Sequence, residues 1–198
     1  MSLRIIVPHR GLAVAKTRLA QVLDDADRQA LALRLLERVL GVAHAACSDV
    51  VVISPSAALG EVVAGAGATL VVQRGMGLNA GLDQARDAAR ADSIQGLAIL
   101  HGDLPNLTSA DVEALLQPIE DGAGVAIAPD RAGAGTNGLA LRPIDAIPFR
   151  FGLGSFAAHR EEAQRAGLPL AVVERPGLAF DLDTPADLAR WIELGDAA

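Results

Sequence analysis

Short runs of apolar residues alternate along the chain with longer segments in which apolar residues recur every three or four positions. The short runs predict buried strands, and the longer segments predict helices that bury one face. The expected strands span residues 3–7, 50–54, 69–73, 97–100, 125–128, 139–141 and 170–173. The expected helices span residues 26–46, 57–64, 78–91, 109–116, 155–166 and 185–194. This alternation predicts an α/β fold with a mainly parallel sheet and helices on both faces.

Composition narrows this picture to one domain. The chain has 198 residues, of which 51% are hydrophobic, and neither a repeat nor a linker interrupts it, so we expect a single domain over residues 1–198. The net charge of -7 and the aromatic content of 3% argue against nucleic acid as a partner. No signal peptide precedes the first strand, and no apolar run approaches the roughly 18 residues of a membrane span. We therefore expect a cytoplasmic protein without a membrane partner.

Three aspartates follow strand-like runs. Asp181 and Asp183 stand two residues apart, and in an extended strand such residues face the same side. Asp103 follows the apolar run at 97–100. Carboxyl ends of parallel strands meet at one edge of a sheet, where ligands bind. Carboxylate oxygens are ligands that Mg²⁺ prefers, commonly together with a phosphate substrate. The three acids therefore predict a phosphate-handling metal site.

Helix capping is an alternative interpretation of the last of these segments. Thr184 suits the N-cap, Pro185 the first helical position and Asp187 the third. Capping would account for Asp183 but leaves Asp181 unexplained. From this pair alone, metal binding and a capped turn both stay open.

The loop after the first strand carries four side chains that can be cationic, His9, Arg10, Lys16 and Arg18. Arginine grips phosphate through two hydrogen bonds, and lysine acts as a point charge, so we expect Lys16 and Arg18 to clamp a triphosphate. The loop matches neither the Walker A pattern nor the dinucleotide-binding glycine fingerprint. A solvated basic loop is the alternative.

Two glycine-rich segments open helices. Asn79 in the segment 75–81 either caps the helix that follows or contacts a base edge or a phosphate. Ser155 in the segment 151–156 is expected as the N-cap of a helix whose N-terminus suits a phosphate or a carboxylate. His159 lies one turn further on, and we interpret it as structural.

A third glycine-rich segment spans residues 133–138 and contains Asn137-Gly138, a strong hairpin signal. It predicts a hairpin between two strands or, alternatively, a backbone cradle for an anionic substrate with Thr136 donating its hydroxyl.

Six ordered motifs together resemble one known family. They are V-P…A-K-T-R-L-A at 7–20, G-L-N-A at 77–80, G-D-L-P at 102–105, G-T-N at 135–137, F-R-F-G-x-G-S-F-x-x-H at 149–159 and D-x-D-T-P at 181–185. The set is similar to the CofC/FbiD guanylyltransferases, which make the phosphodiester precursor of the deazaflavin coenzyme F420. The resemblance covers nearly the whole chain, although no single motif is specific.

The resemblance implies a single-domain, Rossmann-like nucleotidyltransferase fold and an enzyme of the EC 2.7.7 type. It would transfer GMP from GTP to the phosphate of a three-carbon phospho-carboxylic acid, releasing pyrophosphate. The acceptors are phosphoenolpyruvate, 3-phosphoglycerate and 2-phospholactate. The implied metal ligands for Mg²⁺ are Asp103, Asp181 and Asp183, and the implied catalytic residues are Asp103, Lys16 and Arg18. GTP would be bound by Lys16, Arg18, Asn79 and Pro105, and the acceptor by Thr136, Gly152 and Ser155.

Two departures from the family pattern leave the acceptor open. His9-Arg10 stands where the family usually has a small apolar residue and Lys, and His101-Gly102 stands where it often has Pro-Ala. The alternatives are a nucleotidyltransferase of the molybdenum-cofactor or sugar-phosphate type, or a non-catalytic nucleotide-binding module. The expected partners are GTP, the phospho-acid and a downstream deazaflavin transferase that takes the product, with a homodimer left open.

Overall fold

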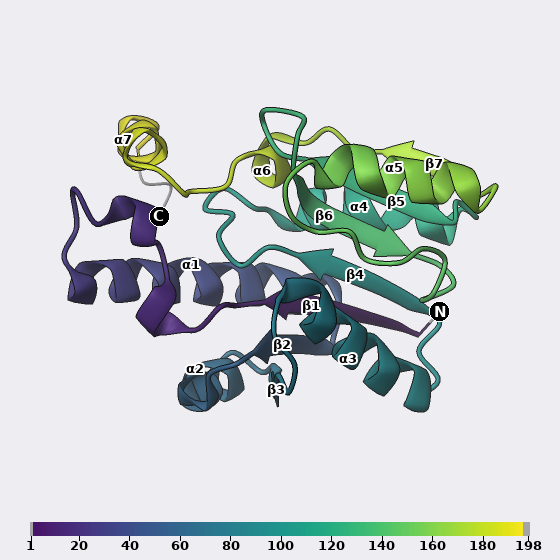
Figure 1. The fold of residues 1–198 in the computed structure, drawn as a ribbon, viewed down its shortest axis with the longest axis horizontal. Helices are drawn as coiled ribbons and strands as arrows, with labels where there is room; N and C mark the ends of the chain where they lie inside the picture. Colours follow the sequence, from purple (N-terminus) through teal and green to yellow (C-terminus); the bar gives the residue numbers. More distant parts are fainter. Residues whose placement is uncertain (1, 196–198) are drawn as a thin grey trace.

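The apolar runs form one mixed sheet of seven strands within residues 2–195, the part of the chain that the computed structural model describes (Figure 1). The limits of the single domain expected over residues 1–198, Met1 and Ala198, lie outside the described residues. The strands are β1 Leu3–Pro8, β2 Val50–Ser54, β3 Thr69–Val72, β4 Gly96–Leu100, β5 Val125–Pro129, β6 Thr136–Leu141 and β7 Leu170–Val172. Their order is β3-β2-β1-β4-β6-β5-β7, and β6 alone runs antiparallel to both neighbours. The expected mainly parallel sheet is confirmed.

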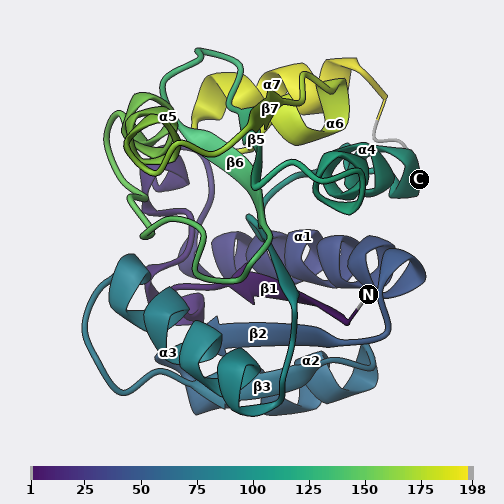
Figure 2. The same ribbon diagram turned by 90° about the vertical axis from the view of Figure 1, so that its right-hand side faces the viewer.

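Helices cover both faces of the sheet, as expected (Figure 2). They are α1 Asp25–Ala46, α2 Gly60–Gly65, α3 Leu78–Ala91, α4 Ser109–Glu120, α5 Ser155–Arg165, α6 Pro176–Ala179 and α7 Pro185–Glu193, with short 3-10 turns η1 Leu12–Val14, η2 Thr17–Leu19 and η3 Ala57–Leu59. One core lies between the sheet and α1, α2 and α4, and a second lies between the sheet and α3 and α5.

Alternation along each central strand feeds these two cores. Ile5 of β1 packs on the side of α1, whereas Ile6 packs on the side of α3. In β4, Leu100 and Ile99 divide between the same two sides. Both faces of the central strands are therefore apolar, because neither is exposed to water.

Side-chain caps set the starts of α1, α4 and α7. Asp24 caps α1 by accepting from the backbone N–H of Asp27 at 2.8 Å, and Thr108 and Thr184 each complete a capping box. The helix expected to end at residue 116 continues through Pro118 to Glu120, because burying Ile119 favours the extra turn. The short helix α6 has no counterpart among the predicted elements.

A small third core holds the C-terminal segment over the carboxyl ends of β1 and β4. It contains Leu19, Leu35, Phe180, Leu182 and Trp191, contributed by η2, α1 and the segment around α7. This packing brings the N-terminal loop and the end of the chain together (Figure 1). None of the helices in the described chain has the length and apolar character that crossing a bilayer requires.

Two glycines offer a matched test of how closely the sheet packs against α4. A Cβ on Gly138 in β6 would lie 2.9 Å from Leu115 Cδ2 and 3.2 Å from Ala128 Cβ, whereas a Cβ on Gly41 in α1 meets nothing within 4 Å. We expect Gly138→Ala to destabilise the fold by about 1–3 kcal/mol through overpacking. Gly41→Ala should stabilise it by about 0.5–1 kcal/mol, because alanine restricts the unfolded chain. Urea unfolding measures both, and a shift of the same sign in the two variants would contradict the packing described.

Candidate active site

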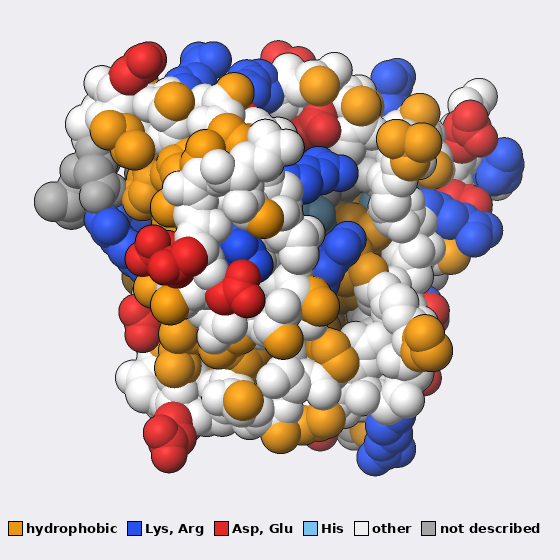
Figure 3. Space-filling view, turned by 60° about the vertical axis from the view of Figure 1, so that its left-hand side comes forward, with side chains coloured by type: hydrophobic (Ala, Val, Ile, Leu, Met, Phe, Trp, Pro, Cys, Tyr) orange, Lys and Arg blue, Asp and Glu red, His pale blue; other side chains and the backbone are white. Residues whose placement is uncertain are grey.

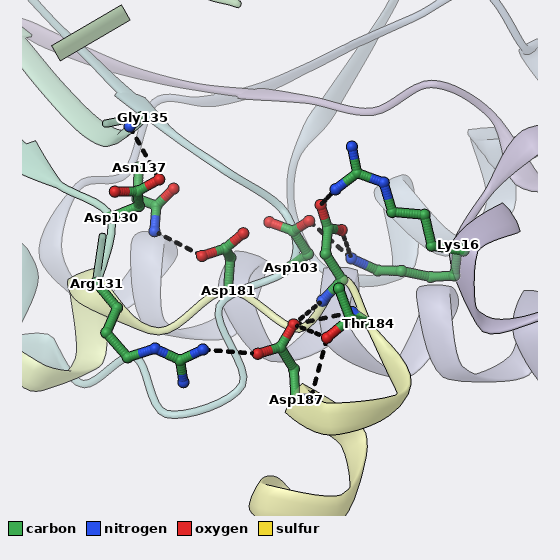
Figure 4. A network of polar contacts seen from close by, with 11 residues as sticks. Lys16, Asp103, Asp130, Arg131, Gly135, Asn137, Asp181, Thr184 and Asp187 are labelled. Atoms are coloured by element: carbon green, nitrogen blue, oxygen red, sulfur yellow. Dashed lines mark hydrogen bonds and ion pairs between the residues drawn. The ribbon is translucent and has the colours of Figure 1, made fainter. Parts of the chain in front are cut away.

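A buried lysine joins the first loop to two of the predicted aspartates. Lys16 Nζ lies 2.7 Å from Asp103 Oδ2 and 3.0 Å from Asp183 Oδ1 (Figure 4). The Lys16 side chain is only 7% exposed. Its burial alone would lower the pKa of the amine, but the two carboxylates outweigh that effect and raise it. Lys16 is therefore held charged between two carboxylates.

The backbone at Lys16 is unusual. It adopts the left-handed conformation, with φ 51° and ψ 36°, which residues other than glycine rarely adopt. Such a conformation costs on the order of 1–3 kcal/mol and persists only where surrounding contacts enforce it. The ion pairs of Lys16 with Asp103 and Asp183, at the carboxyl ends of the strands, are such contacts.

Asp103 is the central acid of this group. Burial by itself would raise the pKa of its carboxyl, but the Lys16 ammonium and His101 lower it, so the carboxylate is ionised. Its Oδ1 atom is buried and has no hydrogen-bond partner among residues 2–195. A buried carboxylate oxygen without a partner is costly unless a ligand or an ion satisfies it.

Asp181 lies beside Asp103, on the side away from Lys16 (Figure 4). Its Oδ1 accepts a hydrogen bond from Asn137 Nδ2 at 3.3 Å, and Asn137 also donates to the carbonyl of Leu178 at 2.9 Å. Burial, followed by the nearby Asp103 carboxylate, raises the pKa of Asp181. The folded protein therefore holds an acid whose ionised form is disfavoured, and a cation there would relieve this.

Asp181 and Asp183 do not lie in the extended strand that the spacing argument assumed. The segment is irregular, and its one backbone bond to the site runs from the N–H of Leu182 to the carbonyl of Asp103, at 3.1 Å. Because Leu182 is fully buried in the third core, the acids on either side of it still flank the Asp103 loop. The apolar packing of Leu182, rather than strand pairing, thus holds Asp181 and Asp183 beside the Asp103 loop.

Capping and the charge cluster coexist in the same segment. Asp187 accepts from the backbone and hydroxyl of Thr184 and receives Arg131 at 2.9 Å, as Figure 4 shows. The backbone of Asp183 joins this cap, but its carboxylate lies against Lys16. The capping interpretation therefore accounts for Asp187 and not for the side chains of the predicted site.

Among the residues that the structure describes, no three His, Cys, Asp or Glu side chains are arranged as a ready metal site. The Lys16 ammonium instead lies between two of the three predicted ligands. Arg18 stands at the rim, 73% exposed, with its guanidinium 3.6 Å from Asp183.

His9 adds a polar group that the sequence left without a role. Its Nδ1 accepts from the backbone N–H of Gly11 at 2.9 Å, and burial lowers its pKa despite the opposing effect of Asp103. The ring is therefore neutral, and its proton lies on Nε2. His9 can present an N–H donor near Lys16 and Asp103.

The predicted acceptor residue Thr136 begins β6 at a β-bulge. Ala128 pairs with Gly138 and Pro129 pairs with Thr136, so Asn137 is an extra residue in this strand. The extra residue turns Thr136 toward His159, at 3.1 Å, while Asn137 turns toward Asp181. A regular strand would have placed Thr136 on the side of Gly138.

The expected hairpin joins β5 and β6, but its turn is not at Asn137-Gly138. Asp130 instead accepts from the backbone N–H groups of Ala134 and Gly135, each at 2.9 Å. This side-chain-capped turn leaves Asn137 inside the strand (Figure 4).

The other two acceptor residues lie where α5 begins. The N-cap of α5 is Gly154 in the left-handed conformation, so the expectation that Ser155 caps the helix is wrong. Ser155 is the first helical residue, and its N–H donates to the carbonyl of Gly152 at 3.2 Å. Gly152 has φ 134°, which favours glycine. The Ser155 hydroxyl therefore makes no capping hydrogen bond to α5.

Asn79 joins the start of α3 to the loop before α5. Its Oδ1 accepts from the N–H of Phe151 at 2.9 Å, and its Nδ2 donates to the carbonyl of Phe151 at 3.0 Å. The cap interpretation of Asn79 is therefore wrong, since α3 is preceded by Gly77. Pro105 is buried in the loop that carries Asp103.

The surface has a hollow at this edge of the sheet (Figure 3). Figure 3 shows it on the side where the carboxyl ends of β1 and β4 lie, with histidine at its floor and basic and acidic side chains around it. The sequence motifs from distant parts of the chain thus converge on a single surface.

Comparison with known proteins identifies the family. A model of the family described as guanylyl transferase CofC like matches residues 3–197. The chain belongs to the CofC family of guanylyltransferases. The family resemblance of the sequence motifs is thereby confirmed.

Individual relatives cover most of the chain. It is 44% identical over 191 residues to the phosphoenolpyruvate guanylyltransferase of Rubrobacter xylanophilus, covering 96% of this chain and 93% of that one. It is 38% identical over 190 residues to the 3-phospho-D-glycerate guanylyltransferase of Phenylobacterium zucineum, covering 92% and 86%.

Solved structures confirm the nucleotidyltransferase fold. The 2-C-methyl-D-erythritol 4-phosphate cytidylyltransferase of Thermus thermophilus superposes with a TM-score of 0.62 at 18% identity, covering 98% of both chains. A CMP:2-keto-3-deoxy-manno-octonic acid synthetase complexed with CTP gives 0.66 at 16% identity, with the same coverage.

In this CofC-family site, sequence reasoning assigned no role to Asn137 and interpreted His159 as structural. Asn137 holds Asp181, and His159 is fully buried against Thr136. The position of His159, four residues after Ser155 and thus on the same helix face, was the available signal. The sequence marks Asn137 as a hairpin signal and as part of the G-T-N motif, but it does not show where its side chain points, because the bulge is a property of strand pairing.

Burial gives the guanylyltransferase a pH-dependent stability. It lowers the pKa of His159 from its usual 6.5 to about 4, with Glu162, Arg150 and His101 as charged or titratable neighbours. Between these values the unfolded chain binds a proton that the folded chain does not, so stability falls as pH falls from about 6.5 toward about 4. The burial of neutral His159 thus lowers the free energy of unfolding at acidic pH by on the order of 3 kcal/mol.

His159→Gln removes the titrating group, so the free energy of unfolding of this variant should fall less between about pH 6.5 and about pH 4 than that of the wild type. Urea unfolding of both proteins across this pH range measures the difference. An identical pH dependence in the two proteins would contradict it.

Proposed function

We propose that this protein transfers GMP from GTP to the phosphate of phosphoenolpyruvate or 3-phosphoglycerate, releasing pyrophosphate, as a step of coenzyme F420 biosynthesis. One observation carries the proposal: the charged cluster of Lys16, Asp103 and Asp183 lies beside Asp181, which Asn137 of β6 binds, and the neighbouring residue of β6, Thr136, contacts α5 through His159. The names of the relatives support the choice of acceptors.

The cationic groups suit the nucleotide. Lys16 and Arg18 are the cations of the first loop that contact the Asp183 carboxylate, and the His9 Nε2–H is a further donor in the same loop. A guanidinium and an ammonium neutralise the charge that develops on the α-phosphoryl group and on the leaving pyrophosphate. We place GTP on this side, along with Asn79 and Pro105 as the residues that shape the loops around it.

The acids suit a magnesium ion. Asp103, Asp181 and Asp183 would hold it, because Asp103 has an unpartnered buried oxygen and the raised pKa of Asp181 reflects uncompensated negative charge. When bound, the ion supplies charge neutralisation at the phosphates. Lys16 competes for the same carboxylates, so its ammonium would be released toward the triphosphate.

The neutral donors suit the acceptor. Thr136, the backbone at Gly152, Ser155 and the N-terminus of α5 offer hydroxyl and N–H groups without an added charge. This cradle fits a small acid that carries both a phosphate and a carboxylate. Phe151 closes one side of it, 4.8 Å from the His159 ring.

The reaction needs no protein nucleophile or strong base. An oxygen of the acceptor phosphate attacks the α-phosphorus of GTP, a new P–O bond forms, and the bond to the pyrophosphate breaks. The attacking oxygen is already deprotonated near neutral pH, so positioning and charge neutralisation carry the catalysis. The product would then pass to a deazaflavin transferase. The homodimer that the sequence leaves open is tested by measuring the mass of the protein in solution.

We expect Asp181→Asn to lower kcat by about two orders of magnitude or more, because loss of a metal ligand removes several kcal/mol of transition-state stabilisation. The variant should stay folded. Its wild-type carboxyl has a raised pKa, so the ionised form costs stability near neutral pH and the amide relieves that cost. Steady-state kinetics and thermal unfolding measure the two effects.

Glu174→Gln, which removes one charge from an exposed position, is the matched control and should behave as the wild type. Full activity of Asp181→Asn would remove Asp181 from the metal site. Unfolding of that variant would instead make the acid structural.

The acceptor is tested by competition. With limiting GTP, Mg²⁺ and equal phosphoenolpyruvate, 3-phosphoglycerate and 2-phospholactate, mass spectrometry of the products should show guanylylation of one of the first two acids. Guanylylation of a sugar phosphate or molybdopterin, with none of the three acids used, would refute the proposed function.

A further inference from the structure

His159 is the most completely enclosed polar residue beside the proposed acceptor cradle. Its side chain is 0% exposed, and both ring nitrogens have a partner. Nε2 lies 2.9 Å from the backbone N of Arg150, and Nδ1 lies 3.1 Å from Thr136 Oγ1. The ring thereby links the loop before α5 to the bulged start of β6.

The partners dictate where the ring carries its proton. A backbone N–H can only donate, so Nε2 accepts from Arg150 and is unprotonated. A neutral imidazole must then carry its proton on Nδ1. The ring is neutral near pH 7, because burial lowers its pKa to about 4. The Nδ1–H group therefore faces the oxygen of Thr136 and the backbone carbonyl of Ser155, and in either case Thr136 cannot donate to Nδ1.

This arrangement sets the direction of the Thr136 hydroxyl. Its oxygen faces the Nδ1–H group of His159, so its own proton must point elsewhere, and the structure gives it no acceptor among residues 2–195. The residue is 2% exposed, which leaves the hydroxyl little freedom to turn toward water. The N–H of Phe156 donates to the carbonyl of Ala134 at 3.2 Å, so the start of α5 lies beside the start of β6, and we assign the free side of Thr136 to the proposed acceptor cradle there.

We propose that His159 is a positioning residue, which makes the Thr136 hydroxyl an obligatory hydrogen-bond donor to the phospho-carboxylic acid. The proposal rests on the proposed function for the identity of that acid. An anion accepts hydrogen bonds and cannot donate them, so a hydroxyl locked as a donor favours it over a neutral hydroxyl-bearing ligand. The same ring fixes the N–H of Arg150 and so the loop that carries Gly152.

Two substitutions separate the two nitrogens of the ring. Glutamine at position 159 can reach the place of Nε2 and accept from Arg150, but it lacks the donor to Thr136. Asparagine can place an amide donor near Nδ1 but lacks the acceptor. His159→Gln should raise KM for the acceptor about tenfold to hundredfold, the usual range for a hydrogen bond to a charged group, and leave KM for GTP within about twofold. His159→Asn should raise the acceptor KM less.

A double-mutant cycle tests whether the effect runs through Thr136. Thr136→Val removes the hydroxyl, so adding His159→Gln to it should cost no further acceptor affinity. His44→Gln, the same change at an exposed position of α1, is the matched control. Losses that add in the double mutant, or an equal loss for GTP, would make His159 merely structural and overturn the proposal.

Nitrogen-15 NMR of histidine-labelled wild-type protein reads the tautomer directly, without any variant or any activity. The expected state of His159 is the neutral Nδ1–H tautomer near pH 7. An Nε2–H tautomer or a charged ring in an active enzyme would overturn this inference alone. The Nδ1–H tautomer in a protein that guanylylates neither acid would overturn the proposed function and the acceptor role of His159 with it.

Discussion

Mutual repulsion of three carboxylates at one edge of the sheet is the constraint on which the site depends. Asp103, Asp181 and Asp183 come from two distant segments, and the fold must compensate them. It does so unequally: the buried ammonium of Lys16 pairs with Asp103 and Asp183, whereas Asp181 receives only an amide hydrogen bond and keeps a raised pKa. This imbalance is what a divalent cation and a polyphosphate can correct.

The site has a charged half, around Asp103, and a neutral half, around Thr136, with different electrostatics and separate supports. The charged half rests on the first loop and the third hydrophobic core, which holds Leu182 between the acids. The neutral half rests on the bulge in β6 and on the buried ring of His159. Asn79 bridges from α3 to Phe151 and holds the neutral half in register with the loops before α3. Two anions can thus be received side by side, one by cations and the other by fixed dipoles.

Local patterns along the chain were sufficient for most of the fold and for the family. Apolar runs placed the strands, and Thr184 with Pro185 placed the start of α7, because burial and capping depend on neighbouring residues. The same reasoning misplaced the features that depend on how strands pair with one another. The hairpin turn lies at Asp130–Gly135 rather than at Asn137-Gly138, and no strand forms at Asp181.

The sequence by itself determined the α/β order of elements, the family and the residue types that can meet phosphate and metal. Tertiary structure alone decided how those residues act. The insertion of Asn137 into β6 aims Thr136 and Asn137 at different partners, and the environment of His159 selects its tautomer. Both effects arise from contacts between segments far apart in the chain, and a local pattern carries no record of which donor or acceptor a buried group will meet.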